Sequence, residues 1–151
     1  MTASEWLASV TDCAKLIRAE RNFEEMRRVS ALGLTAPFNP DNVHATRLDS
    51  TRAIDDLLDA QSSRRERLAS AYEEIATARA VFDGMRSVGW LEHESADVLE
   101  ACHVALMRKV DIARALNISY STLKRRYEVG VDWIDAHGVA RAREGAGFAE
   151  S

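Results

Sequence analysis

Two long stretches of the chain contain no proline and only one glycine, Gly84 near the end of the second stretch, and this scarcity is the feature that most constrains its fold. The 151 residues include only 7 Gly and 2 Pro, and both prolines, at positions 37 and 40, lie in one short segment. Between residues 3 and 31, apolar side chains recur at steps of three and four: Trp6, Val10, Cys13, Leu16, Ile17, Phe23, Met26 and Val29. This spacing predicts one long amphipathic helix. Thr2 or Ser4 is expected to cap its start, and Gly33 lies just past its end.

The second stretch, from about residue 49 to residue 85, follows a seven-residue repeat. Steps of four and three alternate through Leu57, Gln61, Arg64, Leu68, Ala71, Ile75, Ala78, Phe82 and Met85. Such spacing is typical of a coiled-coil seam, in which polar members such as Gln61 and Arg64 often set register and partner number. A helix of about 35 residues is about 50 Å long, so something must pack along it. Two packing partners are possible: the first helix folded back as a hairpin, or a second copy of the chain.

These patterns predict an all-α fold of two long helices followed by a three-helix head. The segment 33–50 is rich in Pro, Asn and Asp and is expected to form a long connection. Residues 87–94 are expected to form a break, followed by helices at about 95–103, 108–116 and 120–136. The chain is thus divided into a helical stalk and oligomerisation region (1–86), a head (87–136) and a frayed tail (137–151). Trp133 and Ile134 are expected to pack back on Trp90 or Leu91.

The stretch from Lys109 to Tyr127, KVDIARALNISYSTLKRRY, has the residue order of two helices crossing at a tight turn. Ile112 and Leu116 supply an apolar face, and the small Ala113 allows close approach. Four residues later Asn117 tolerates a left-handed backbone. The next residues can plug the corner (Ile118), cap the second helix (Ser119) and bury its inner face (Leu123 and Tyr127). This pattern predicts a helix-turn-helix.

Charge is distributed unevenly along the chain, whose net charge of -4 and isoelectric point near 5.6 would by themselves argue against nucleic acid. Residues 1–107 carry a net charge of -6, residues 108–128 carry +4, and residues 129–151 carry -2. Six of the 20 basic side chains therefore lie within residues 108–128, which coincide with the predicted helix-turn-helix. A basic patch on an acidic chain indicates a local binding surface for an anion such as DNA.

The second helix of such a motif enters the major groove of double-stranded DNA, with its N-terminal residues nearest the bases. The side chains expected on its exposed side are Tyr120, Ser121, Lys124 and Arg125. Lys and Arg can donate to guanine, and Ser and Tyr can reach bases or phosphates. Phosphate contacts are expected from Arg108, Lys109, Arg114 and Arg126.

The sequence IARALNISYSTLKRRY resembles the C-terminal helix-turn-helix of bacterial sigma factors and of phage transcriptional regulators of the ArpU/RinA type. Their motif runs roughly E-I-A-x-x-L-G-I-S-x-x-T-V-x-x-R-L, and the matching residues are Ile112, Ala113, Leu116, Ile118, Ser119, Thr122, Leu123, Arg126 and Tyr127. Three positions depart from it: Asp111 replaces Glu, Asn117 replaces Gly, and Arg108 to Val110 stand where a capping sequence is common. The resemblance is specific across about 20 residues. It implies a sequence-specific transcription regulator that acts on RNA polymerase at a promoter, encoded by a phage or prophage.

Other function classes find no support in the residues. No nucleophile with a supporting base, and no glycine-rich phosphate loop after a strand, can be identified, so no catalytic residue, enzyme activity or cofactor is predicted. Cys102 and His103, with Cys13 and His93, lack the spacing of zinc ligands, so no metal site is predicted. No apolar run reaches the length of a membrane helix, residues 1–6 lack the basic and apolar regions expected of a signal peptide, and the two cysteines are far apart. The expected location is cytoplasmic, with no membrane partner.

The sequence therefore predicts a DNA-binding transcription regulator that self-associates through its seam, with a dimer favoured because paired heads read two half-sites. Two alternatives stay open. A small terminase-like subunit for DNA packaging would also combine a helical oligomeriser with a helix-turn-helix. A coiled-coil interaction module would carry the basic segment only as surface.

Overall fold

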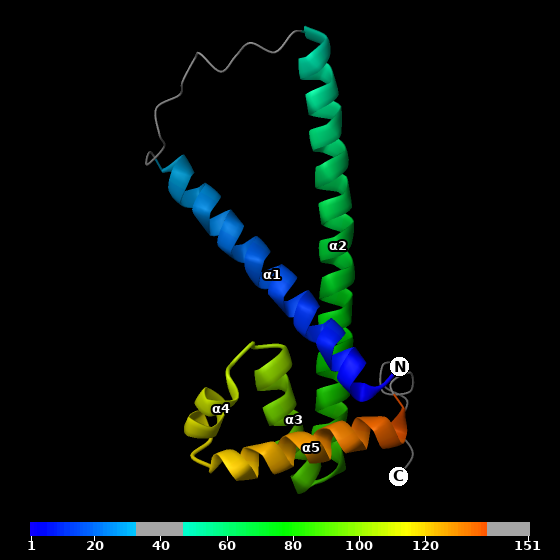
Figure 1. The fold of residues 1–151 in the computed structure, drawn as a ribbon, viewed down its shortest axis with the longest axis vertical. Helices are drawn as coiled ribbons and strands as arrows, with labels where there is room; N and C mark the ends of the chain where they lie inside the picture. The colour runs from blue at the N-terminus through cyan, green and yellow to red at the C-terminus, as the bar shows by residue number, and fades with distance from the viewer. Residues whose placement is uncertain (33–46, 139–151) are drawn as a thin grey trace.

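The computed structural model describes residues 1–32 and 47–138, and within them the chain is all-helical, which confirms the predicted all-α class. The helices are α1 (Ala3–Ala31), α2 (Arg47–Val88), α3 (Trp90–His103), α4 (Lys109–Ala115) and α5 (Tyr120–His137). Helices α1 and α2 run antiparallel, and the three shorter helices gather at the end where α1 begins and α2 ends (Figure 1). Most of the predicted connection 33–50 and of the tail 137–151 lies outside the described residues.

Helix α1 has the bounds that the apolar spacing predicts, and Thr2 is its N-cap. The backbone N–H of Glu5 donates to the Thr2 hydroxyl oxygen at 3.2 Å, and the Thr2 N–H donates to a Glu5 carboxylate oxygen at 2.7 Å. This reciprocal capping box satisfies two N–H groups that have no partner within the helix. The same hydrogen bonds lower the pKa of Glu5. A further bond, from the Ala3 N–H to Asp135 at 2.8 Å, joins the start of α1 to the end of α5.

The predicted break at 87–94 is wrong in extent, because a single residue, Gly89, separates α2 from α3. Its backbone is fully extended (φ -175°, ψ 176°), and α3 begins at the next residue rather than near 95. The resulting elbow is held by Arg86, which donates to Asp83 at 2.8 Å, to Asp97 at 2.9 Å and to Glu100. Although partial burial of the guanidinium opposes it, these hydrogen bonds raise the pKa of Arg86.

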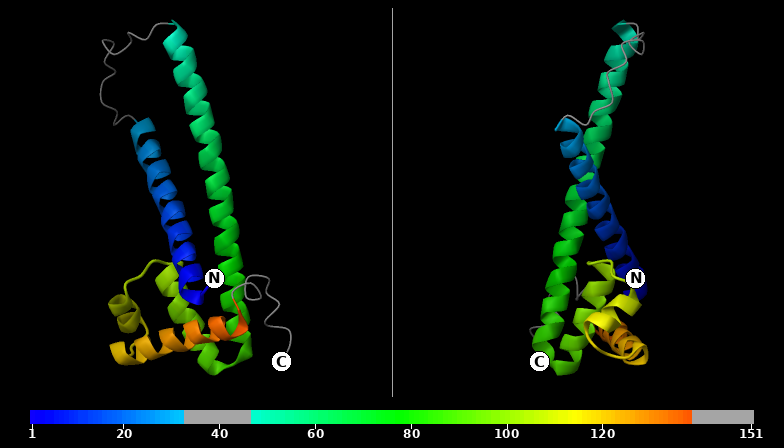
Figure 2. Two further views of the ribbon diagram at one scale, coloured as in Figure 1. Left: turned by 45° about the vertical axis from the view of Figure 1, so that its right-hand side comes forward. Right: turned by 90° about the vertical axis from the view of Figure 1, so that its left-hand side faces the viewer.

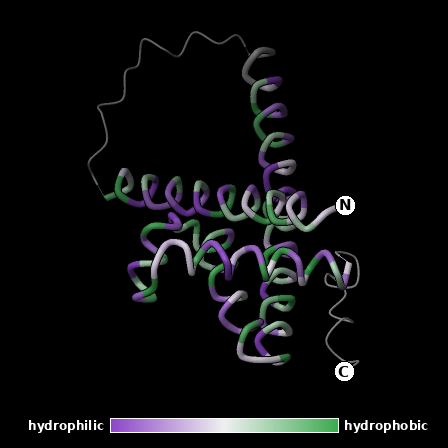
Figure 3. The backbone as a smooth tube through the Cα atoms, turned by 60° about the horizontal axis from the view of Figure 1, so that its bottom comes forward, coloured by the Kyte–Doolittle hydropathy of each residue, from purple (hydrophilic) through white to green (hydrophobic). Residues whose placement is uncertain are grey.

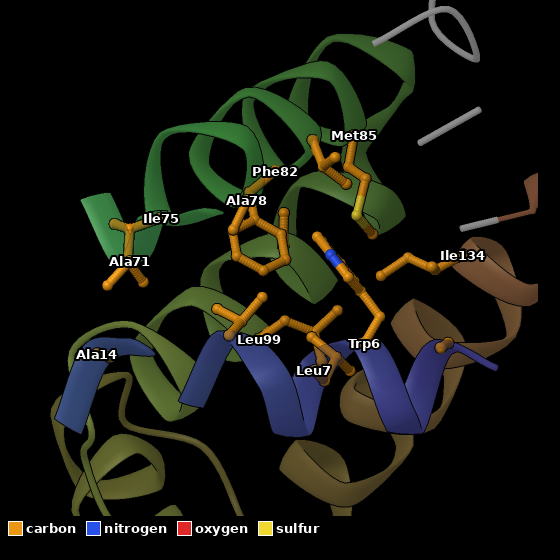
Figure 4. Close-up of a cluster of buried hydrophobic side chains, with 14 of the residues drawn as sticks. Trp6, Leu7, Ala14, Ala71, Ile75, Ala78, Phe82, Met85, Leu99 and Ile134 are labelled. Atoms are coloured by element: carbon orange, nitrogen blue, oxygen red, sulfur yellow. The ribbon is translucent and has the colours of Figure 1, made fainter. Parts of the chain in front are cut away.

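One hydrophobic core unites the start of α1, the end of α2, α3 and α5 (Figure 4). Its largest members are fully buried: Trp6, Leu7, Phe82, Met85, Leu99 and Ile134. The rings of Trp6 and Phe82 are 6.2 Å apart between centroids, and the indole N–H of Trp6 donates to Glu74 at 3.0 Å. Stalk and head therefore share a core, so the predicted division near residue 86 does not separate two packed units.

The heptad seam of α2 packs within the chain over only part of its length. From Ala71 to Met85 its members are buried against α1 and the head, so the first helix does fold back within the same chain. Beyond them, Arg64 of the seam forms an ion pair with Glu20 and lies 4.9 Å from the centroid of the Phe23 ring. Further out the two helices separate (Figures 1 and 2).

The far ends of both long helices carry exposed apolar side chains. Met26 is 68% exposed on α1, and Leu57 is 58% exposed on α2. Figure 3 shows hydrophobic residues recurring along both helices toward these ends, between hydrophilic neighbours. Within one chain the outer part of the seam is therefore uncovered.

The expectation that Trp133 and Ile134 pack on Trp90 or Leu91 differs from the structure. Ile134 is fully buried in the core with Trp6, whereas Trp90 is 76% exposed. The reason is that the start of α1 lies across α5. It covers the apolar face of α5 that was expected to pack on the start of α3. None of the helices in the described ranges is long and apolar enough to cross a membrane.

Candidate nucleic-acid interface

The turn between α4 and α5 is built as its residue order predicts. Asn117 has φ 53°, in the left-handed region that few residues other than glycine adopt. The N–H of Ile118 donates to the Ala113 carbonyl at 3.0 Å, closing the corner. Ser119 caps α5 by accepting the N–H of Thr122 at 3.2 Å. The two helices thus form a compact helix-turn-helix pair.

A small second core fixes this pair on α3. It consists of the buried residues Val98, Ile112, Ala113 and Leu123, with Ile118 and Tyr127 packed partly against them. Leu116, expected on the buried face of α4, is instead 41% exposed, because it stands at the helix end where the chain turns away. Leu123 therefore anchors the inner face of the start of α5.

Five of the eight predicted DNA-contacting residues are exposed side chains at the end of α4 and the start of α5, and we call this set the cationic face: Arg114, Tyr120, Ser121, Lys124 and Arg125. Four of them come from the first two turns of α5, and Ser121 and Arg125 lie on the side opposite the buried Leu123. Among the described residues, no carboxylate lies within ion-pairing distance of Arg114, Lys124 or Arg125. These three cations are free to meet an external anion.

The other three predicted residues already have partners within the chain. Arg108 occupies the N-cap position of α4, and its side chain donates to Asp111 at 2.9 Å, which raises the pKa of Arg108 and lowers that of Asp111. The ammonium nitrogen of Lys109 lies 4.3 Å from the centroid of the Tyr127 ring. Each of these two residues is thus held in a contact within the chain.

Arg126 is the most strongly engaged of the three. Its guanidinium donates to Glu94 of α3 at 2.8 Å, and the two side chains are only 18% and 19% exposed. This ion pair joins the middle of α5 to α3, and its partial shielding from water makes it stronger than a pair on the surface. Arg126 therefore positions α5 against the rest of the head.

His103 forms a link that the sequence analysis missed. Its Nδ1 lies 2.7 Å from the Thr11 hydroxyl of α1, and its Nε2 lies 3.0 Å from the Tyr127 hydroxyl of α5. Since the Thr11 hydroxyl donates to the Leu7 carbonyl, it accepts from Nδ1–H, leaving Nε2 to accept from Tyr127. Burial, together with the charge of Lys109, lowers the pKa of His103 to about 4, which keeps the ring neutral.

Sequence could not reveal this link, because Thr11 and His103 are separated by 92 positions. The same burial raises the pKa of the neighbouring Cys102 thiol, and burial also raises that of Cys13. Both cysteines are free thiols. In the described part of the chain, no group of three or more potential metal ligands comes together.

The backbone of α5 adds to the electrostatics of the cationic face. Its first turn carries no acidic residue. The N–H groups at a helix start and the helix dipole attract anions, phosphate groups included. Side chains and helix terminus thus offer positive potential on the same side of the pair.

Comparison of the chain with family models, with curated proteins and with solved structures finds no match.

Proposed function

We propose that the protein binds double-stranded DNA through α4 and α5 and acts as a sequence-specific regulator of transcription. The observation that carries the proposal is the cationic face. Lys124 and Arg125, unpaired and exposed, project from the start of a helix whose opposite side is anchored by Leu123. In a helix-turn-helix these positions reach base edges in the major groove.

The contacts divide into two kinds. Lys124 and Arg125, with Tyr120 and Ser121, read the bases, and Arg114 contacts phosphate from the neighbouring helix. Arg108 and Lys109 contribute positive charge at the border of the face. Arg126 acts indirectly, through its ion pair with Glu94, by fixing the angle at which α5 enters the groove.

The biological setting of the proposal rests on the motif. The residues from Ile112 to Tyr127 resemble those of sigma factors and phage regulators, which favours recruitment of, or interference with, RNA polymerase at a phage or prophage promoter. The left-handed backbone at Asn117 and the cap at Ser119 support the helix-turn-helix on which this proposal rests.

A second part of the proposal is that two copies associate through the far ends of α1 and α2. The exposed apolar side chains there, Met26 and Leu57 among them, are too numerous to be left in water without a cost. A dimer would present two cationic faces to two half-sites.

The DNA proposal is tested by retention of duplexes from a random-sequence pool, followed by titration of a selected and a scrambled duplex at two salt concentrations. Lys124→Ala with Arg125→Ala should weaken binding to the selected duplex about tenfold or more and remove the preference for it. Arg114→Ala should weaken both duplexes equally and lower the slope of log affinity against log salt by about 0.9.

The matched control is Arg65→Ala with Arg67→Ala, which removes the same charge from an exposed part of α2. If this control weakens binding as much as the α5 pair, the attraction is general and the cationic face is not the site. If no duplex is retained, DNA binding is refuted and an interaction module is favoured.

Association is tested by light scattering. Wild type should have twice the mass of one chain, and Met26→Glu with Leu57→Glu should reduce it to one. A ring of many subunits would instead favour the packaging alternative. A monomeric wild type would contradict pairing through the long helices.

A further inference from the structure

A cleft of about 520 Å³ lies between α1, α2 and the segment that leads from α3 to α4. Its floor is apolar and includes Ala14 and Ile17 of α1 and Ile75 of α2. Ala14 and Ile75 stand at one edge of the core cluster, away from Trp6 and Met85 (Figure 4). Leu106, in the segment before α4, lines it as well.

Three arginines surround this apolar floor. Arg18 and Arg21 lie one turn apart on α1, and Arg79 lies one turn beyond Ile75 on α2. Among the described residues, no carboxylate pairs with any of their guanidinium groups. The acidic residue of the lining, Glu100, is already paired with Arg86. The cleft is therefore cationic, although residues 1–107 as a whole are acidic.

We infer that this cleft binds a small organic anion with an apolar body, such as a medium-chain carboxylate or the corresponding alkyl phosphate. Guanidinium groups match carboxylate and phosphate oxygens in charge and geometry. The apolar floor would remain wet under an inorganic ion or a nucleic-acid backbone, but it would be covered by an alkyl chain. The volume is that of a ligand site for a small molecule, not that of a groove for a helix.

The cleft is distinct from the proposed DNA contacts, because no residue of the cationic face lines it. Its wall does include Val104, Ala105 and Leu106, which lead directly into α4. Leu106 has φ 58°, a strained conformation for leucine, and strained residues occur preferentially at ligand sites and switches. A bound anion would thus contact both the stalk and the chain that positions the helix-turn-helix.

The test is calorimetric titration of the full chain with decanoate, decanol, butyrate and inorganic phosphate. Decanoate should bind with one-to-one stoichiometry. Decanol lacks the charge and butyrate lacks the chain, so each should bind at least about tenfold more weakly, and inorganic phosphate should not saturate a site. Equal affinity for decanol and decanoate would mean simple adsorption to exposed apolar surface and would overturn the inference.

Substitutions of arginine test whether decanoate binds in the cleft. Arg18→Gln with Arg79→Gln should weaken decanoate about tenfold or more, whereas Arg65→Gln with Arg67→Gln removes the same charge outside the cleft and should change little. All four side chains are exposed, so we expect the substitutions to leave the fold intact, which circular dichroism checks. Equal loss in both pairs, or no saturable binding of decanoate by wild type, contradicts the inference. Neither result bears on DNA binding, which is measured separately.

Discussion

Gly130 of α5 lies directly against Leu99 of α3, and a Cβ atom at Gly130 would stand 2.6 Å from Cδ1 of Leu99. The same Cβ would lie 3.2 Å from Cβ of Ser95, whose side chain is also buried. Leu99 and Ser95 are both fully buried, so a shift of either side chain would disturb the atoms packed around it. The close crossing of α3 and α5, and with it the placement of the cationic face, depends on the missing side chain.

Gly130→Val is therefore expected to lower the free energy of unfolding by about 2 kcal/mol, as overpacking of a core does. Denaturant unfolding followed by circular dichroism measures the change. Ala136→Val, at an exposed position of the same helix, is the control and should cost about 0.5 kcal/mol or less. In a double-mutant cycle, Leu99→Ala should relieve part of the cost of Gly130→Val, and strict additivity would contradict the proposed clash.

Local features of the fold could be predicted from the sequence. The bounds of α1 follow from apolar spacing and the Thr2 cap, and the turn at Asn117 follows from residues that act on their immediate neighbours. The all-α class follows from the same signals. These predictions succeed because hydrogen bonds and steric limits within a few residues determine the local backbone.

Long-range contacts could not be predicted in the same way. The heptad spacing of α2 is the same whether the seam packs on α1 or on a second chain. Only the structure shows that its packing on α1 ends near Arg64. Ile134 packs with Trp6 and not with Trp90. The sequence could not identify this partner, because an apolar side chain gains from burial against any apolar surface. The position of Arg126 on α5 likewise did not reveal Glu94 as its partner.

Arg126 and Arg125 are neighbours in sequence but should behave differently. Arg126→Ala leaves the partly buried Glu94 without its partner and should cost about 1–3 kcal/mol of stability. Arg125→Ala removes an exposed side chain and should change stability by about 0.5 kcal/mol or less. Thermal unfolding of the two variants measures the difference. Equal stability of the two would show that the Arg126–Glu94 pair contributes nothing to the head.

The left-handed backbone at Asn117 determines how substitutions there should affect stability. Asn117→Ala should cost about 1 kcal/mol, because a Cβ without a compensating polar group is strained at φ 53°. Asn117→Gly should be close to neutral, since glycine adopts this conformation freely. Urea unfolding at neutral pH provides the measurement. A loss with glycine as large as that with alanine would show that the asparagine side chain, not the backbone, matters.

The low pKa of His103 predicts how stability depends on pH. In the unfolded chain the pKa of histidine is about 6.5, whereas in the fold burial holds it at about 4. Between these values only the unfolded state binds the proton, so stability is lost as pH falls below about 6.5. From pH 7.5 to pH 5.5, His103 should account for a loss of about 1.3 kcal/mol. Denaturant unfolding at both pH values should show this loss in wild type and a smaller one in His103→Gln. His93→Gln, at an exposed position, is the control, and a His103→Gln variant with the full wild-type loss would contradict the assignment.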